Sequence, residues 1–103
     1  MTAIARLEII PVQEQSMSEP IAAAIEALDE FDVSYETTAT DTIIKADSAE
    51  AAFEAARAAH EAVDGERVIT SVEIDDLRGR EQDIEDRVSS VGRELGREPE
   101  RMA

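Results

Sequence analysis

The chain is 103 residues long, 43% apolar and poor in aromatic residues, and its 25 acidic against 10 basic residues give a formal net charge of −15. This length is typical of a single domain with one thin aliphatic core, too small to enclose a deep catalytic cavity as well. The lack of cysteine excludes disulfides and thiolate metal sites, and the negative charge argues against nucleic-acid partners, whose phosphates are bound by basic residues.

The first predicted element is a β-strand within "AIARLEIIPV", residues 3–12. Apolar and polar residues alternate along it, which is typical of a strand with one buried face. Arg6 and Glu8 lie on the polar face, and the strand ends at Pro11 because proline has no N–H to donate to a sheet. The buried face carries Ala3, Ala5, Leu7 and Ile9.

A helix is predicted next, within "EPIAAAIEALDEF" at residues 19–31. Apolar residues spaced at i, i+4, i+7 and i+10 form one stripe of this helix. They are Ile21, Ile25, Leu28 and Phe31. The N-cap is either Ser16, in a capping box with Glu19, or Ser18, which places Pro20 in the first turn.

Two strands and a second helix follow. The segments "VSYETTAT" (33–40) and "DTIIKA" (41–46) are rich in β-branched residues, which favour strands. The helix begins after an N-cap at Asp47 or Ser48, and Gly65 stops it. We expect it to bury one apolar stripe against the sheet. This stripe consists of Ala49, Ala52, Phe53, Ala56, His60 and Val63.

The last two predicted elements are a strand in "RVITSVEID" (67–75) and a helix capped by Asp83. The helix spans about residues 83–95, Gly96 and Pro99 end it, and residues 97–103 form a frayed tail. One face of the strand carries Val68, Thr70, Val72 and Ile74. The apolar stripe of the helix consists of Ile84, Val88, Val91 and Leu95.

The order β-α-β-β-α-β-α predicts an α+β fold of the ferredoxin-like βαββαβ type in a single domain. Right-handed crossovers give a four-stranded antiparallel sheet with two helices on one face, and the third helix is additional. The open face would carry Ile4, Ile10, Ile43 and Ile69 among Arg6, Glu8 and Glu73. We expect a second copy to cover this face in a dimer or a tetramer, with Arg6 paired to a nearby glutamate.

The sequence offers little for catalysis or metal binding. His60 is the only histidine, and its place on an apolar stripe favours a structural role. The acidic run 73–86 lacks the spacing of a calcium loop, because Arg78 and Arg80 interrupt it. There is no glycine-rich phosphate loop, nucleophile elbow or zinc-protease motif. We therefore expect a protein that is not an enzyme and that uses no cofactor or metal.

The acidity points to an environment as well as to a function. Carboxylates are spread along the whole chain and only one basic residue is lysine, which resembles the proteins of salt-loving archaea. Molar salt shortens the screening length to about 3 Å, so carboxylate repulsion costs little there. An ordinary acidic protein is the alternative. Since no apolar span or signal peptide is visible, we expect a cytoplasmic protein without a membrane partner.

Residues 34–47, "SYETTATDTIIKAD", are rich in hydroxyl groups. Threonine is common in strands, so these side chains are either ordinary strand residues or the polar lining of a binding site. The hydroxyls that raise the question belong to Tyr35, Thr37, Thr38, Thr40 and Thr42.

Several segments, taken in order, resemble the small ferredoxin-like thiamine-binding proteins of archaea and bacteria. They are "EIIPV" (8–12), the serines at 16 and 18, Tyr35 followed seven residues later by "TII", the late helical His60, and "RVITSVEID". The resemblance extends from Ala3 to about Leu95. It implies a tetramer associated through its sheets, which binds thiamine or its hydroxymethylpyrimidine half without catalysis.

The resemblance also implies the ligand-binding residues, which are Ser16, Ser18, Tyr35, Thr37 and Thr42. Thr37 is placed by position only, as is Thr38. Hydroxyls would pair with the edge of an aminopyrimidine, and Tyr35 would stack on its face. The chain departs from the family at Asp41 and Lys45, where glycine and glutamate are frequent. The alternative function is an oligomeric regulatory or scaffold protein without a small-molecule ligand.

Overall fold

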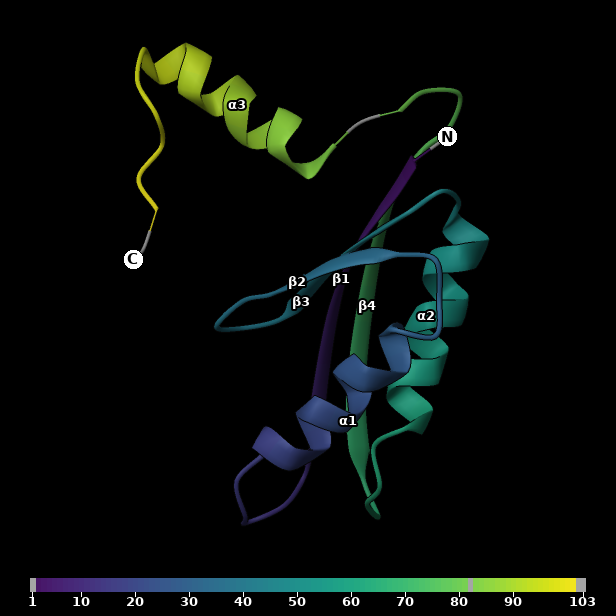
Figure 1. Ribbon diagram of the computed structural model, residues 1–103. Coiled ribbons are helices and arrows are strands. Elements are labelled where there is room, and N and C mark those ends of the chain that lie inside the picture. Colours follow the sequence, from purple (N-terminus) through teal and green to yellow (C-terminus); the bar gives the residue numbers. More distant parts are fainter. Residues whose placement is uncertain (1, 82, 102–103) are drawn as a thin grey trace.

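The computed structural model describes residues 2–81 and 83–101. The order of its elements is the predicted β-α-β-β-α-β-α (Figure 1). The strands are β1 (Thr2–Pro11), β2 (Ser34–Thr37), β3 (Thr42–Ala46) and β4 (Val68–Leu77). The helices are α1 (Ser18–Leu28), α2 (Ala49–Glu61) and α3 (Ile84–Leu95).

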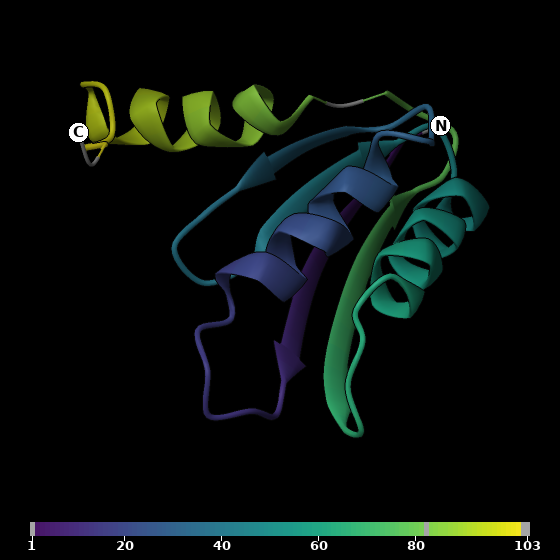
Figure 2. The same cartoon turned by 60° about the horizontal axis from the view of Figure 1, so that its bottom comes forward.

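The four strands form one antiparallel sheet in the order β2-β3-β1-β4. α1 and α2 lie side by side on the same face of this sheet, as Figures 1 and 2 show. The predicted ferredoxin-like α+β fold is therefore confirmed. No helix in the described part of the chain is both long enough and apolar enough to cross a membrane.

The core lies between the helix-covered face of the sheet and the two helices, and it consists mainly of small side chains. Alternate residues of β1 are buried in it as predicted, namely Ala3, Ala5, Leu7 and Ile9. Leu28 of α1 and Ile44 of β3 are its largest fully buried apolar residues. Val68 and Ile74 of β4 pack against its margin.

The predicted stripe of α2 is wrong in two of its residues. Phe53 is 57% exposed, and His60 is also exposed, with its Nδ1 hydrogen-bonded to the Thr70 hydroxyl of β4. Alanine takes the inward positions, because α2 has to fit closely against both the sheet and α1. The buried residues of α2 are Ala52, Ala55, Ala56 and Ala59. Ser48 caps the helix, accepting a hydrogen bond from the Ala51 N–H.

The start of α1 also differs from the prediction. Its N-cap is Met17, and no side chain caps the helix. Ser18 is the first helical residue, and Ser16 accepts a hydrogen bond from the Ser18 N–H at 3.2 Å. The predicted capping box with Glu19 is therefore not formed, because Ser16 binds the nearest N–H instead. Phe31 lies beyond the end of the helix and packs against the core.

The opposite face of the sheet is free of helices in its central part (Figure 2). Ile10 and Ile69 are cross-strand neighbours at one end of it, 37% and 43% exposed. Near its middle, the Arg6 guanidinium lies 3.6 Å from Glu73 and 3.5 Å from Asp41. Arg6 thus pairs with a glutamate of its own chain. The charged side chains of Arg6 and Glu73 separate the Ile10–Ile69 pair from Ile4 and Ile43, the other two isoleucines predicted on this face.

α3 extends from the end of β4 and projects away from the two-layer core (Figures 1 and 2). Its predicted ends are confirmed, since Asp83 forms a capping box with Asp86 and Gly96 ends the helix with a φ of 74°. Yet no residue of α3 is buried, and Val91 and Leu95 are 53% and 50% exposed. Residues 97–101 of the predicted tail have no helix or strand, and residues 102–103 lie outside the described part.

Candidate functional site

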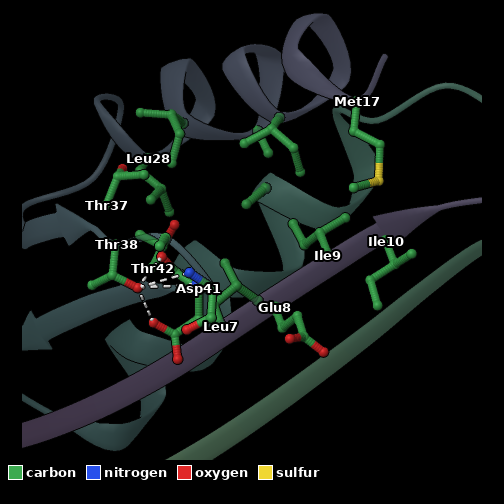
Figure 3. A pocket seen from close by; sticks show the side chains of 16 residues that line it. Leu7, Glu8, Ile9, Ile10, Met17, Leu28, Thr37, Thr38, Asp41 and Thr42 are labelled. Carbon is green, nitrogen blue, oxygen red and sulfur yellow. Dashed lines mark hydrogen bonds between the residues drawn. The ribbon is translucent and has the colours of Figure 1, made fainter. Parts of the chain in front are cut away.

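A cavity of about 290 Å³ opens between α1, β1 and the hairpin formed by β2 and β3 (Figure 3). Its origin is the unequal length of the strands. β3 pairs with β1 only as far as Leu7, where Thr42 is the partner, whereas β1 continues to Pro11 against β4 alone. The sheet is therefore narrower under the first turns of α1, and the space that a longer hairpin would occupy remains open.

One wall of the cavity is apolar and comes from α1 and β1. It consists of Leu7, Ile9 and Ile10 of β1, Ala24, Ile25, Ile21 and Leu28 of α1, the preceding Met17, and Ala59 of α2. The opposite rim is the hairpin, residues 37–42, which supplies four threonines and Asp41. Glu8 adds a second carboxylate. Neither lysine nor arginine is among the residues that line the cavity.

The tip of the hairpin is held in shape by hydrogen bonds of Thr38. Its hydroxyl donates to the Asp41 Oδ1 at 2.7 Å and accepts from the backbone N–H of Asp41 at 3.1 Å (Figure 3). The Thr38 N–H donates to the Asp41 carbonyl at 2.8 Å. Side-chain to backbone bonds of this kind are typical of turns. The rim is therefore already ordered before any ligand binds.

Thr37 and Thr42, which were predicted as ligand-binding residues, both line this cavity, and so does Thr38. Thr37 and Thr42 are cross-strand partners in the hairpin. Thr42 is buried, whereas Thr37 is exposed. Threonines directly opposite each other place two hydroxyls within reach of one small ligand.

Tyr35 is two residues before Thr37 on the same face of β2, but it does not line the cavity. Its hydroxyl donates to the Asp29 Oδ1 at 2.7 Å, just after α1. This hydrogen bond raises the pKa of Tyr35, because it stabilises the neutral phenol and the carboxylate repels a phenolate. Stacking of Tyr35 on a ligand remains a prediction.

Ser16 lies in the loop that precedes α1, and Ser18 is the first residue of α1. Their hydroxyls hydrogen-bond to each other at 3.2 Å. Neither serine lines the cavity, although Met17 between them does. Ser16 instead borders a separate hollow with Gln13, Gln15 and Glu19. A ligand contact from either serine therefore remains a prediction.

The sequence reasoning missed the contributions of α1 and of Asp41 to this site. The apolar stripe of α1 was assigned wholly to the core, yet Ile21 and Ile25 also form cavity wall. Asp41 was noted only as a departure from a family pattern. A signal existed, since it is the single acid within the hydroxyl-rich stretch 37–42. Among the described residues, no group of three or more histidines and carboxylates could hold a metal ion.

Known proteins resemble this chain along most of its length. A family model described as thiamine-binding protein matches residues 5–92. A UPF0045 protein of Methanothermobacter thermautotrophicus is 39% identical over 92 residues, which cover 84% of this chain and 93% of the relative. The crystal structure of a hypothetical protein of Methanocaldococcus jannaschii aligns with a TM-score of 0.80 at 31% identity, covering 88% of this chain and 96% of the other.

A further crystal structure, of a Thermotoga maritima protein provisionally assigned to thiamine biosynthesis or salvage, aligns with a TM-score of 0.65. The identity is 21%, with 88% of this chain and 99% of the other covered, so this likeness shows the fold. The match over residues 5–92 and the two archaeal relatives decide the family. The resemblance seen in the sequence is thereby confirmed, and this chain belongs to the thiamine-binding protein family.

Proposed function

We propose that this protein binds thiamine, or its hydroxymethylpyrimidine half, in the cavity between α1 and the β2–β3 hairpin, without catalysing a reaction. The observation that carries the proposal is the construction of the cavity, which has an apolar wall facing a rim of hydroxyls. Its volume of about 290 Å³ is close to the lower end of the roughly 300–1,000 Å³ of small-ligand sites. A single substituted ring fits such a space, and the rest of thiamine would extend through the opening.

A flat heterocycle would use both sides of the cavity. The side chains of α1 and β1 would contact its apolar faces, and the hydroxyls of Thr37 and Thr42 would pair with its ring nitrogens and amino group. Hydroxyls serve both as donors and as acceptors, so they suit an aminopyrimidine edge, which offers both. Burying one ring against aliphatic walls supplies the affinity, and the hydroxyls fix the orientation.

The polar groups of the rim support binding rather than catalysis. Thr38 and Asp41 are already hydrogen-bonded to each other in the hairpin. His60 contacts Thr70 of β4, the edge strand at the other side of the sheet from β2. A hydroxyl needs an adjacent general base to become a nucleophile, and the Asp41 carboxylate is hydrogen-bonded to Thr38, which is not one of the proposed ligand contacts Thr37 and Thr42. Neither histidine nor lysine is among the residues that line the cavity.

Association with further copies, as a dimer or a tetramer, belongs to the same proposal. The Ile10–Ile69 pair on the open face and Val91 and Leu95 of α3 support it, because a second copy would bury apolar side chains that this chain leaves exposed. The excess of carboxylates supports a cytoplasm rich in salt, where the repulsion between copies would be screened. Light scattering at molar and at low KCl measures the number of associated copies and how it depends on salt.

Thermal unfolding with added ligand tests the binding proposal. Thiamine or hydroxymethylpyrimidine at about 100 times its dissociation constant should stabilise the fold by about 2.7 kcal/mol. Thr42→Val should abolish this gain while the chain stays folded. The matched control is Thr70→Val, on the same face of the sheet but outside the cavity. If neither ligand raises the midpoint for the unmodified protein, the proposal is wrong and the scaffold alternative is favoured.

A further inference from the structure

The charged groups that line the cavity are all negative. They are Asp41 on the hairpin and Glu8 on β1. The side chain of Asp41 is only 12% exposed, whereas Glu8 is an exposed residue, so Asp41 is the more deeply placed of the two. Its Oδ1 accepts the Thr38 hydroxyl at 2.7 Å, and its Oδ2 lies 3.5 Å from the Arg6 Nε. A carboxylate in such a position is stable only when it is well supplied with donors.

The donors that Asp41 has in the described structure do not use its full capacity. An ionised carboxylate offers about four lone pairs; the Thr38 hydroxyl takes one of them on Oδ1, and the Arg6 guanidinium forms only an ion pair with Oδ2 at 3.5 Å. Arg6 is also shared, because it lies 3.6 Å from Glu73. One guanidinium therefore serves two carboxylates, which leaves the surroundings of Asp41 negative. A donor arriving from the cavity would improve this balance.

We propose that Asp41 determines the specificity of the cavity, accepting a hydrogen bond from the amino group or protonated ring of a heterocycle and, with Glu8, excluding ligands that carry phosphate. This inference rests on the proposed function, since it concerns the same cavity. It names the ligand class as an unphosphorylated ring with a donor on its edge. A phosphate adds about 1.5 to 2 negative charges at neutral pH, and no basic residue lines the cavity to balance them.

Arg6 has a different role in this scheme. It does not line the cavity, and it approaches Asp41 from the open face of the sheet. A second hollow, on the open face, is lined by Arg6, Ser71, Val72 and Glu73, and it shares Glu8, Thr40 and Asp41 with the cavity. Arg6 is therefore a positioning residue that holds the Asp41 carboxylate, and a change on the open face should be felt by a ligand on the other side.

Titration calorimetry with four probes tests the specificity. The probes are thiamine, thiamine monophosphate, hydroxymethylpyrimidine, and the pyrimidine analogue that has hydrogen in place of the amino group. The unmodified protein should bind each amino-bearing, phosphate-free probe roughly ten- to a hundredfold more tightly than its counterpart, because a buried acceptor is left unpaired or a like charge is brought in. Measurements at low salt keep the contribution of charge visible.

Asp41→Asn is the decisive variant, since it keeps the size and an acceptor for Thr38 but removes the charge. It should weaken hydroxymethylpyrimidine roughly tenfold and reduce the discrimination against thiamine monophosphate. The matched control is Glu36→Gln, which removes the same charge from the same hairpin outside the cavity. That control should bind all four probes as the unmodified protein does.

The role of Arg6 is tested by Arg6→Gln, which should weaken hydroxymethylpyrimidine, and by Arg6→Lys, which should restore most of the affinity. A purely structural role would instead lower the unfolding midpoint without changing the ratio of affinities between the probe with the amino group and the probe with hydrogen in its place. Equal binding of thiamine and its monophosphate, or identical behaviour of Asp41→Asn and Glu36→Gln, overturns the inference but leaves the proposed function standing. No binding of any pyrimidine overturns both.

Discussion

α2 and α3 are nearly equal in length, yet they use their apolar side chains in opposite ways. α2 buries four alanines against the sheet and leaves its one large apolar residue, Phe53, outside. α3 carries a stripe of larger residues but buries none of them. An amphipathic pattern therefore shows that a helix has an apolar face, and it does not show that the same chain covers that face. Closeness of approach, which alanine permits, decides which helix joins the core.

The largest expected contrast is between a core residue and a residue of α3. Ile44→Ala should lower the free energy of unfolding by about 2–5 kcal/mol, because Ile44 is fully buried and a cavity would remain. Leu95→Ala should cost less than about 0.5 kcal/mol in dilute protein. Chemical denaturation at one fixed salt concentration measures both. Equal losses would show that α3 belongs to the same cooperative unit as the core.

A second contrast lies within α2 itself. Ala55→Leu should destabilise the fold by about 1–3 kcal/mol, since Ala55 is fully buried between helix and sheet and a larger side chain would force them apart. Phe53→Ala, on the exposed side of the same helix, is the control and should have little effect. Thermal unfolding compares the two variants. A large loss from the Phe53 variant would mean that another chain covers this side of α2.

The caps of the two helices should also differ in their effect. Ser48→Ala removes the acceptor of the Ala51 N–H and should lower the stability of the whole fold by about 1 kcal/mol. Asp83→Ala removes the capping box of α3, so it should reduce the helical circular dichroism signal without moving the main unfolding midpoint. The Asp83 carboxylate also lies 3.8 Å from the Lys45 Nζ of β3, so a fall in that midpoint with Asp83→Ala would show that this ion pair connects α3 to the stability of the core.

The smallest expected effect is a pH dependence at Tyr35, on the core side of the comparison. The hydrogen bond to Asp29 raises the pKa of Tyr35 above its ordinary value of 10.0 in the folded state. The contact therefore contributes fully below pH 10.0, and its contribution is lost as the pH rises through the higher folded value. Because the chain has one tyrosine, ultraviolet absorbance reports this titration directly. Asp29→Asn should move the midpoint down, and an unchanged midpoint would contradict the contact.

Much of the fold could be predicted from the sequence, because local patterns determine it. Alternation in residues 3–9 gave the buried face of β1, and Asp83 and Gly96 gave the ends of α3. The inward face of α2 could not be found in this way. Counting large apolar residues selected Phe53, whereas the tight packing of α2 required alanine, which carries almost no hydrophobic signal of its own.

The candidate site was predicted in part. Strand pairing within a short hairpin brings Thr37 and Thr42 together, and this could be anticipated from their spacing. The cavity itself could not, because it depends on where β3 stops relative to β1, which is a property of the assembled sheet. Asp41 was missed although it is the single acid in residues 37–42, and its link to Arg6, which crosses from one strand to the loop between two others, could not be foreseen.

The early end of β3 has a consequence for how such a protein can evolve. Because the ladder between β1 and β3 stops at Leu7, the length of the hairpin determines how much of the remaining part of β1 it covers. Adding one residue to each strand of the hairpin would extend it by about 3.3 Å along β1 and make the cavity smaller, while every core position stayed the same. Insertions and deletions in this one turn would thus change the size of the ligand that the cavity accepts while the core residues that stabilise the fold stayed in place.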